Sequence, residues 1–150
     1  SKHIKHTSLR DISKPYRLAV FTALSGNVTV PVYDEKRLVS ATDTTFVLLS
    51  TQQQTPQEEN DCTWISRASI DIEVTQKTGS EVSKDDIDDI SNLICGILIT
   101  APFYTTLTST NLQFQNAFIE SIISRNLSIS ETESVLIKII RFVCTVTEQN

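Results

Sequence analysis

The most closely spaced acidic residues form the run DDIDD at positions 85–89. Asp85 and Asp89 are one turn apart if this stretch is helical, so their carboxylates share a face. A helix holds carboxylates in a row, however, rather than wrapping them around an ion as a calcium loop does, and no His or Cys accompanies them. We therefore interpret the run as the solvated start of a helix, where the dipole favours acids. An acidic contact for a basic neighbour, made by Asp85, Asp86 and Asp89, stays open.

Asp71 and Glu73 are the next candidates for chemistry, because they lie on one face of an alternating strand at a spacing of about 7 Å. Such a pair is typical of glycosidases, but nothing in the sequence around them indicates the apolar pocket that would raise one pKa. The only histidines, His3 and His6, are close to the N-terminus, so no Ser-His-Asp set can be assembled. We expect no enzyme, no cofactor and no metal site.

Three cysteines, Cys62, Cys95 and Cys144, are far apart in the sequence. The spacing excludes a CxxC motif, and the odd count disfavours a complete disulfide framework. Cys95 and Cys144 stand in apolar runs and are predicted to be small core residues.

Composition limits the remaining classes. The chain has 150 residues, which predicts a single domain, and 36 of them are Ser or Thr while only 3 are Gly. This balance favours long β-strands. The net charge of −5 disfavours nucleic acid as the main partner. No stretch is apolar enough to span a membrane, and the polar N-terminus lacks the apolar part of a signal peptide, so we expect the chain to fold in a cytoplasm.

Basic residues gather at the beginning of the chain, among them Lys5, Arg10 and Arg17. The simplest interpretation is a flexible, solvated arm over about residues 1–10. The alternative is an arm that docks on an acidic neighbouring subunit.

The first half of the chain predicts one helix and two strands. Apolar residues recur at helical spacing over residues 11–25, with Asp11 or Ser13 as the cap and Gly26 as the stop. Residues 28–33 are extended, 44–52 form an apolar strand and 63–76 a long alternating strand. The polar stretch 53–61 is either a solvated hairpin tip or an extended hairpin that touches a neighbour. Trp64 is either a packing or an interface residue.

The second half predicts a helix and two more strands. A helix spans 83–99, a loop 100–111, and extended segments 112–123 and 133–147 flank a turn at 126–130. In the last segment Val135, Ile137 and Ile139 share one face while other apolar residues occupy the opposite face. Such a strand is either sandwiched or gives one face to an interface. The whole order predicts a single α+β domain, with a largely antiparallel sheet of about four to five strands and two helices packed on it.

The order and spacing of four segments resemble a known family. They are VPVYD at 30–34, FVLLS at 46–50, ASIDIEV at 68–74 and the helix at 82–98 that contains DIDDI. Together they resemble the tail completion or tail terminator proteins of tailed bacteriophages. The resemblance covers about residues 16–98. The stretch 61–67 departs from the family in lacking Gly-rich character, and the part after residue 100 is longer and more Thr-rich.

The resemblance implies a structural virion protein of the tail or neck, assembled in the host cytoplasm as a homo-oligomeric ring of six or twelve subunits. Its neighbours would be portal or connector and tail proteins, and genome DNA would pass through the lumen without specific binding. Basic residues 2–17 and acidic residues 85–89 offer opposite charges for the head-to-tail contacts of a ring. The alternative is a soluble adaptor that recruits a partner at an exposed sheet edge by strand addition.

Overall fold

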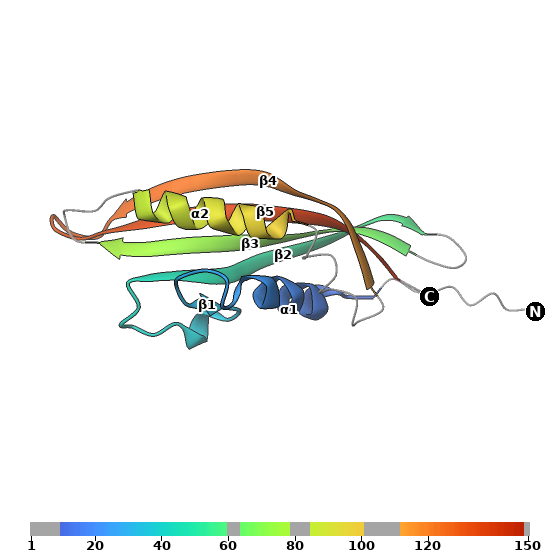
Figure 1. Cartoon of the computed structure of the whole chain (residues 1–150), viewed down its shortest axis with the longest axis horizontal. Helices are drawn as coiled ribbons and strands as arrows, with labels where there is room; N and C mark the ends of the chain where they lie inside the picture. Colours follow the sequence, from blue (N-terminus) through green and yellow to red (C-terminus); the bar gives the residue numbers. More distant parts are fainter. Residues whose placement is uncertain (1–9, 60–63, 79–84, 101–111, 149–150) are drawn as a thin grey trace, which may run out of the picture.

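The structure is a computed structural model that describes residues 10–59, 64–78, 85–100 and 112–148. It contains two α-helices, one short 3-10 helix and five strands (Figure 1). In chain order they are α1 (Ser13–Leu24), β1 (Val32–Tyr33), η1 (Lys36–Leu38), β2 (Thr45–Glu59), β3 (Trp64–Thr78), α2 (Asp85–Leu98), β4 (Leu112–Ser128) and β5 (Ser134–Glu148).

All five strands belong to one sheet in the order β1-β2-β3-β5-β4. The short β1 runs parallel to β2, and every other pair is antiparallel. The predicted α+β fold, with two helices on a largely antiparallel sheet, is confirmed. Strand β4 forms one edge of the sheet, and β1 shields only a short part of β2 at the other edge.

Both helices pack on the same face of the sheet. The buried side of α1 carries Tyr16, Val20 and Leu24, and that of α2 carries Ile94 and Leu98. Both sets belong to one hydrophobic cluster with the inward side chains of β2, β3, β4 and β5. The three- and four-residue spacing that predicts each helix is therefore the spacing of its buried stripe.

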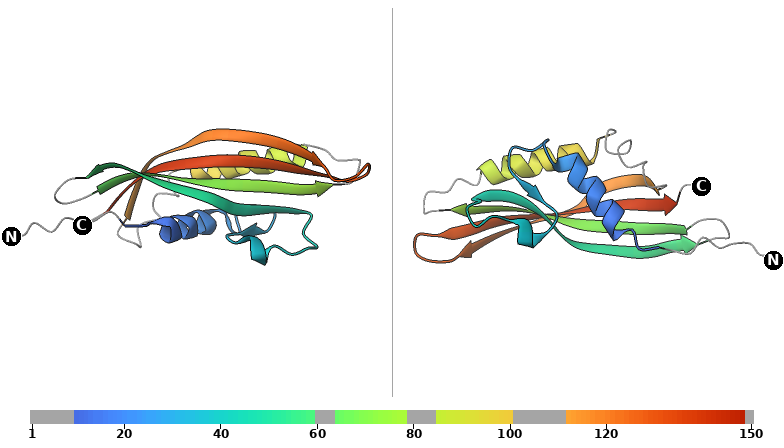
Figure 2. Two further views of the ribbon diagram at one scale, coloured as in Figure 1. Left: turned by 180° about the vertical axis from the view of Figure 1, so that it is seen from behind. Right: turned by 90° about the horizontal axis from the view of Figure 1, so that it is seen from below.

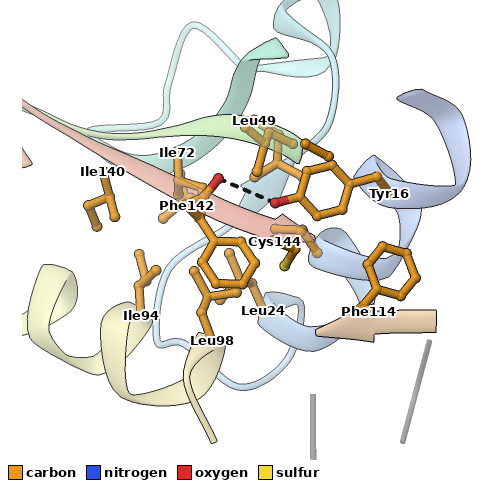
Figure 3. Packing of buried hydrophobic residues seen from close by; sticks show 14 of the residues in the cluster. Tyr16, Leu24, Leu49, Ile72, Ile94, Leu98, Phe114, Ile140, Phe142 and Cys144 are labelled. Atoms are coloured by element: carbon orange, nitrogen blue, oxygen red, sulfur yellow. Dashed lines mark hydrogen bonds between the residues drawn. The ribbon is translucent and has the colours of Figure 1, made fainter. Parts of the chain in front are cut away.

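Tyr16 lies at the centre of this core (Figure 3). Its ring stacks on Phe114 and Phe142, with centroids 5.8 and 6.3 Å away. Its hydroxyl donates to the carbonyl oxygen of Phe142 at 3.3 Å, which satisfies the phenol in an apolar site. One side chain thus joins α1 to both β4 and β5.

The predicted stop of α1 is confirmed, but its predicted cap is wrong. The N-cap residue is Ile12, which has no side-chain hydrogen bond to the helix, and Ser13 is already the first helical residue. Asp11 Oδ1, one residue before the cap, accepts from the hydroxyl of Ser13 and from its backbone N–H at 2.9 Å, and these hydrogen bonds lower the pKa of Asp11. Gly26, with φ of 81°, adopts the left-handed conformation after the last turn.

The polar stretch 53–61 is not a loop over its described part, because β2 continues to Glu59. Register shifts after Leu49 and after Pro56 absorb the irregular sequence. The glutamines are held by side-chain contacts: Gln54 donates to the Arg10 carbonyl at 3.0 Å and accepts from the Ile12 N–H at 3.1 Å. The described part of the stretch is therefore extended and anchors the start of α1, while its contact with a neighbour stays a prediction.

The predicted turn at 126–130 is placed too early. Strand β4 runs to Ser128, and the turn at 129–133 is closed by the N–H of Ile129 donating to the carbonyl of Glu133 at 2.9 Å. The polar residues that predict the turn belong instead to β4, an exposed edge strand on which polar side chains face solvent. The predicted loop at 100–111 lies outside the described residues beyond Thr100. Neither helix in the described ranges meets the length and apolarity of a membrane span.

Candidate interaction surface

The sheet has a face that neither α-helix covers, which we call the open face. The left view of Figure 2 shows β3, β5 and β4 from this side, with α2 behind them. Strand register assigns its side chains, because directly paired residues project to the same face. Two neighbouring rows cross the strands in the order β4, β5, β3 and β2. The first row is Arg125, Ile137, Thr75 and Phe46, and the second is Ile123, Ile139, Glu73 and Leu48.

The predicted interface residues Val135, Ile137 and Ile139 all lie on the open face and are half-buried. The alternate residues of β5, among them Ile140 and Phe142, are fully buried against the helices. The strand that is apolar on both faces therefore contributes one face to the core and one to the open face.

The neighbouring edge strand β4 carries the largest concentration of exposed apolar side chains among the described residues. Phe118, Ile123 and Leu127 are 45%, 45% and 50% exposed and lie on the open face. Ile122, on the opposite face, and Ile129, in the turn, are also exposed. Contiguous exposed apolar surface of this kind marks interaction sites.

The outward backbone groups of β4 pair with no described strand, since β4 ends the sheet. Its first half is irregular: register shifts follow Gln115 and Ile119, and Asn116 has a φ of 52°. Its second half pairs with β5 without interruption from Ser121 to Ser128. That regular half has no proline and a single charged residue, Arg125, so it lacks the usual protection of an edge strand.

A charged cluster crosses the centre of the open face. Arg141 donates to both carboxylate oxygens of Asp71 at 2.9 and 3.2 Å. Glu120, in the irregular part of β4, forms an ion pair with Arg67 and lies 4.0 Å from Arg141. The Arg67 guanidinium lies 6.0 Å from the centre of the Phe118 ring. The cluster balances two positive with two negative side chains.

A hollow of about 650 Å³ opens on the open face beside the segment 34–41, which contains η1. Its floor includes Phe46, Leu48 and Ile137, and its lining has charges of both signs, from Asp34, Glu35, Glu73, Lys36 and Lys77. The Lys77 ammonium lies 5.8 Å from the centre of the Phe46 ring. The Tyr33 ring packs edge-on against Phe46, and its hydroxyl donates to Asp43. That hydrogen bond raises the pKa of Tyr33.

The geometry gives the hypothetical carboxylate pair no catalytic setting. Asp71 is only 8% exposed, so the expectation of a solvent-facing residue is wrong for it; its partner Arg141 satisfies it instead. The hydrogen bonds with Asp71 also raise the pKa of Arg141. Among the described residues, no group of three His, Cys, Asp or Glu side chains is placed to hold a metal ion.

Trp64 must be removed from the interface candidates. Its side chain is 1% exposed and belongs to the core cluster, so it presents no surface to a neighbour. Of the two interpretations, packing is the one that the structure supports.

The basic candidates are only partly described. Lys5 lies outside the described residues. Arg10 is exposed, and its carbonyl is held by Gln54. Arg17 is half-buried and donates to Gln52 Oε1 at 3.2 Å, so its charge is engaged within the subunit.

The acidic candidates lie at the start of α2. Asp86 and Asp89 are exposed, as a solvated helix start requires, while nothing is described of the Asp85 side chain. Asp88, which we did not single out, forms an ion pair with Lys138 and ties α2 to β5. The structure brings these acids to the helix side of the sheet, away from Val135, Ile137 and Ile139.

The cysteines are placed as packing residues. Cys144 is fully buried and Cys95 half-buried, and both are free thiols. Burial raises the pKa of Cys144 to about 12 and also raises that of Cys95. Cys62 lies outside the described residues.

The residues that sequence reasoning missed belong mainly to β4 and to the segment beside the hollow. Phe118, Ile123 and Leu127 share a face although their spacing is not a regular alternation, because the register shifts change the phase of the strand. Leu38, 47% exposed on η1, lies in a polar stretch where a single apolar residue gives no periodic signal.

Comparisons with known proteins add no relative: neither a protein-family model nor a curated protein matches this sequence.

Proposed function

We propose that this chain is a structural, non-catalytic virion protein of a tailed bacteriophage, a ring-forming tail completion or neck subunit at the head-tail junction. The proposal combines the resemblance stated above with one observation, the unprotected regular half of β4. An unpaired edge with exposed apolar side chains on both faces can bind another polypeptide through its backbone groups and these side chains.

A ring subunit needs two different contact surfaces that meet head to tail. Strand β4 provides one of them. The other edge of the sheet offers the second contact surface. Strand β1 pairs with β2 only at Val47 and Leu48, so β1 does not cover the rest of that edge. Assembly through main-chain hydrogen bonds at both edges would explain why the chain has long strands and few charged edge residues.

The charge arrangement supports the same function. Asp86 and Asp89 are exposed on α2 and available to a basic neighbour. With a net charge of −5 the ring would not attract DNA to its lumen, so genome DNA would pass without specific binding. A strongly basic lumen in an assembled ring would contradict this part of the proposal.

The decisive experiment is to locate the protein in particles. Mass spectrometry of purified virions should find the chain in a copy number of six or twelve, and labelled electron microscopy should place it between head and tail. Deletion of its gene should leave filled heads and tails that do not join. A chain absent from purified virions would overturn the proposal.

The second candidate is a soluble adaptor that binds a partner strand at the same β4 edge. The same observation favours it, because an unprotected edge accepts a foreign strand as readily as a second subunit. Co-purification of one partner that is not a virion protein, together with absence from particles, would favour the adaptor over the ring.

A further inference from the structure

We propose that the open face is a self-complementary surface that pairs with the open face of a second copy of this chain around a two-fold axis. This contact goes beyond the ring proposed above, because it uses the side chains of the open face and not the backbone edge of β4. It is stated for the chain alone and is tested without virions.

The two halves of the open face differ in shape. One half is raised, where the segment 34–41 lines the hollow over β2. In the other half, the bare half, no described element lies in front of β5 and β4 (Figure 2), and the strand register places Ile123 and Leu127 there. A second copy turned about an axis parallel to the strands lays its raised half on the bare half of the first, and the reverse contact forms at the same time.

Both halves lie at the same level along the strands. Arg125 on β4, Ile137 on β5, Thr75 on β3 and Phe46 on β2 form one continuous row. A rotation about an axis parallel to the strands keeps this level. The bare end of the row in one copy therefore meets the hollow of the other, and aligned packing of two sheets needs no further adjustment.

The two halves also differ in charge. The bare half carries Arg125 between the exposed apolar side chains Ile123 and Leu127. The hollow of the raised half is lined by more carboxylates than ammonium groups, namely Asp34, Glu35 and Glu73 against Lys36 and Lys77, and η1 adds the exposed Leu38. Arg125 of one copy therefore meets a hollow of net negative charge in the other, while the Arg141–Asp71 pair, in which the charges balance, lies at the centre of the face.

A two-fold pair is compatible with the proposed ring. A ring closed through the strand edges and doubled through the open faces has dihedral symmetry, so twelve subunits would form two rings of six. The two rings of six depend on the proposed function, whereas the two-fold pair does not.

The test is sedimentation equilibrium of the purified full chain over about 1–200 μM. We expect a reversible species of twice the 16.8 kDa subunit mass. Leu127→Ser and Arg125→Glu should each weaken the association at least tenfold. The matched control is Leu93→Ser, which removes an equally large side chain that is 42% exposed on α2 and should leave association unchanged.

Symmetry is tested by crosslinking Leu38→Cys/Ile123→Cys chains with a short bismaleimide, with the wild-type chain as the control for native thiols. A reciprocal pair gives a crosslinked dimer and no longer product, whereas a head-to-tail contact gives a ladder of multimers. A wild-type chain that stays monomeric at 200 μM, an association unaffected by Leu127→Ser, or a ladder would each overturn the two-fold pair. None of these results bears on whether the chain is found in virions, so the two proposals fail independently.

Discussion

Arg141 on β5 donates two hydrogen bonds to the carboxylate of Asp71 on β3, from Nε at 2.9 Å and from Nη2 at 3.2 Å. The two residues are directly paired in the strand register, although 70 positions separate them in the chain. The Asp71 side chain is 12% exposed and that of Arg141 is 42% exposed. A nearly buried carboxylate is therefore satisfied by a guanidinium that still reaches solvent.

We expect Asp71→Asn and Arg141→Met each to lower the midpoint of urea unfolding. Each change removes one partner of a bidentate pair, and the methionine variant also leaves a nearly buried carboxylate without its donor. The double variant should lose less stability than the sum of the two single losses, because the second change removes the group that the first change leaves without a partner. Strictly additive losses would show that the pair is not coupled.

Removal of the Tyr16 hydroxyl tests the anchor at the centre of the core. Tyr16→Phe should cost about 1–2 kcal/mol of unfolding free energy, because the hydrogen bonds of the hydroxyl with the Phe142 carbonyl and with the Cys144 side chain are lost while the ring stays packed. Tyr16→Ala should cost about 3–5 kcal/mol, since it also leaves a cavity between Phe114 and Phe142. Urea denaturation followed by far-UV circular dichroism measures both. Equal losses in the two variants would contradict the packing role of the ring.

Gln54 should hold the start of α1. Its amide donates to Arg10 and Ser66 and accepts from the N–H of Ile12, so Gln54→Ala removes three contacts. We expect a loss of about 1–3 kcal/mol and faster hydrogen exchange at Ile12. Gln53→Ala, next to it and exposed, is the control and should change neither. Unchanged exchange in the Gln54 variant would mean that α1 is held by its apolar stripe alone.

Asn116 should tolerate glycine and reject a β-branched residue. With a φ of 52° it occupies the left-handed region, which Asn adopts more easily than most residues. Asn116→Val should cost about 1–2 kcal/mol through backbone strain, whereas Asn116→Gly should cost less. Gln113→Val, exposed in a regular part of the same strand, is the control. Equal stability of the two valine variants would rule out strain at this position.

The thiol of Cys144 should resist alkylation in the folded protein. Burial raises its pKa to about 12, so at pH 8 it is the neutral thiol, and its side chain has no exposed surface. Iodoacetamide followed by peptide mass spectrometry should modify Cys144 only after unfolding. Cys95, which is half-buried, should react more slowly than a free thiol but before Cys144. Rapid labelling of Cys144 in native conditions would contradict its place in the core.

The helices and the core strands were predictable because their signals are local. The stripe of α1 and the stop at Gly26 depend on residues within a few turns of each other, and the structure keeps both. The polar stretch around Gln54 was harder, because its strand is stabilised by pairing with β3 and by contacts to α1, which no local pattern contains. Burial of Trp64 likewise depends on where distant elements pack.

The candidate surface was only half predictable. Val135, Ile137 and Ile139 were identified because β5 alternates without interruption. Their neighbours Ile123 and Leu127 were not, because the adjacent Ile122 and Ile123 leave the face of the strand ambiguous and the polar residues around Leu127 predict a turn. Pairing of Asp71 with Arg141 follows from the strand order, which the order of elements along the chain does not determine.

The position of β5 has a consequence for co-translational folding. In the sheet it lies between β3 and β4, yet it is made after both. About 70 residues separate the end of β3 from the end of β5, so at 5–20 residues per second a nascent chain presents β3 with one open flank for about 4–14 s. During that interval Ile70, Ile72 and Val74 have a strand neighbour only on the β2 side, and the backbone edge that pairs with β5 stays open. We therefore expect the nascent chain to bind chaperones during this interval. The yield of folded protein should depend more on the speed of translation than on the stability of the folded state.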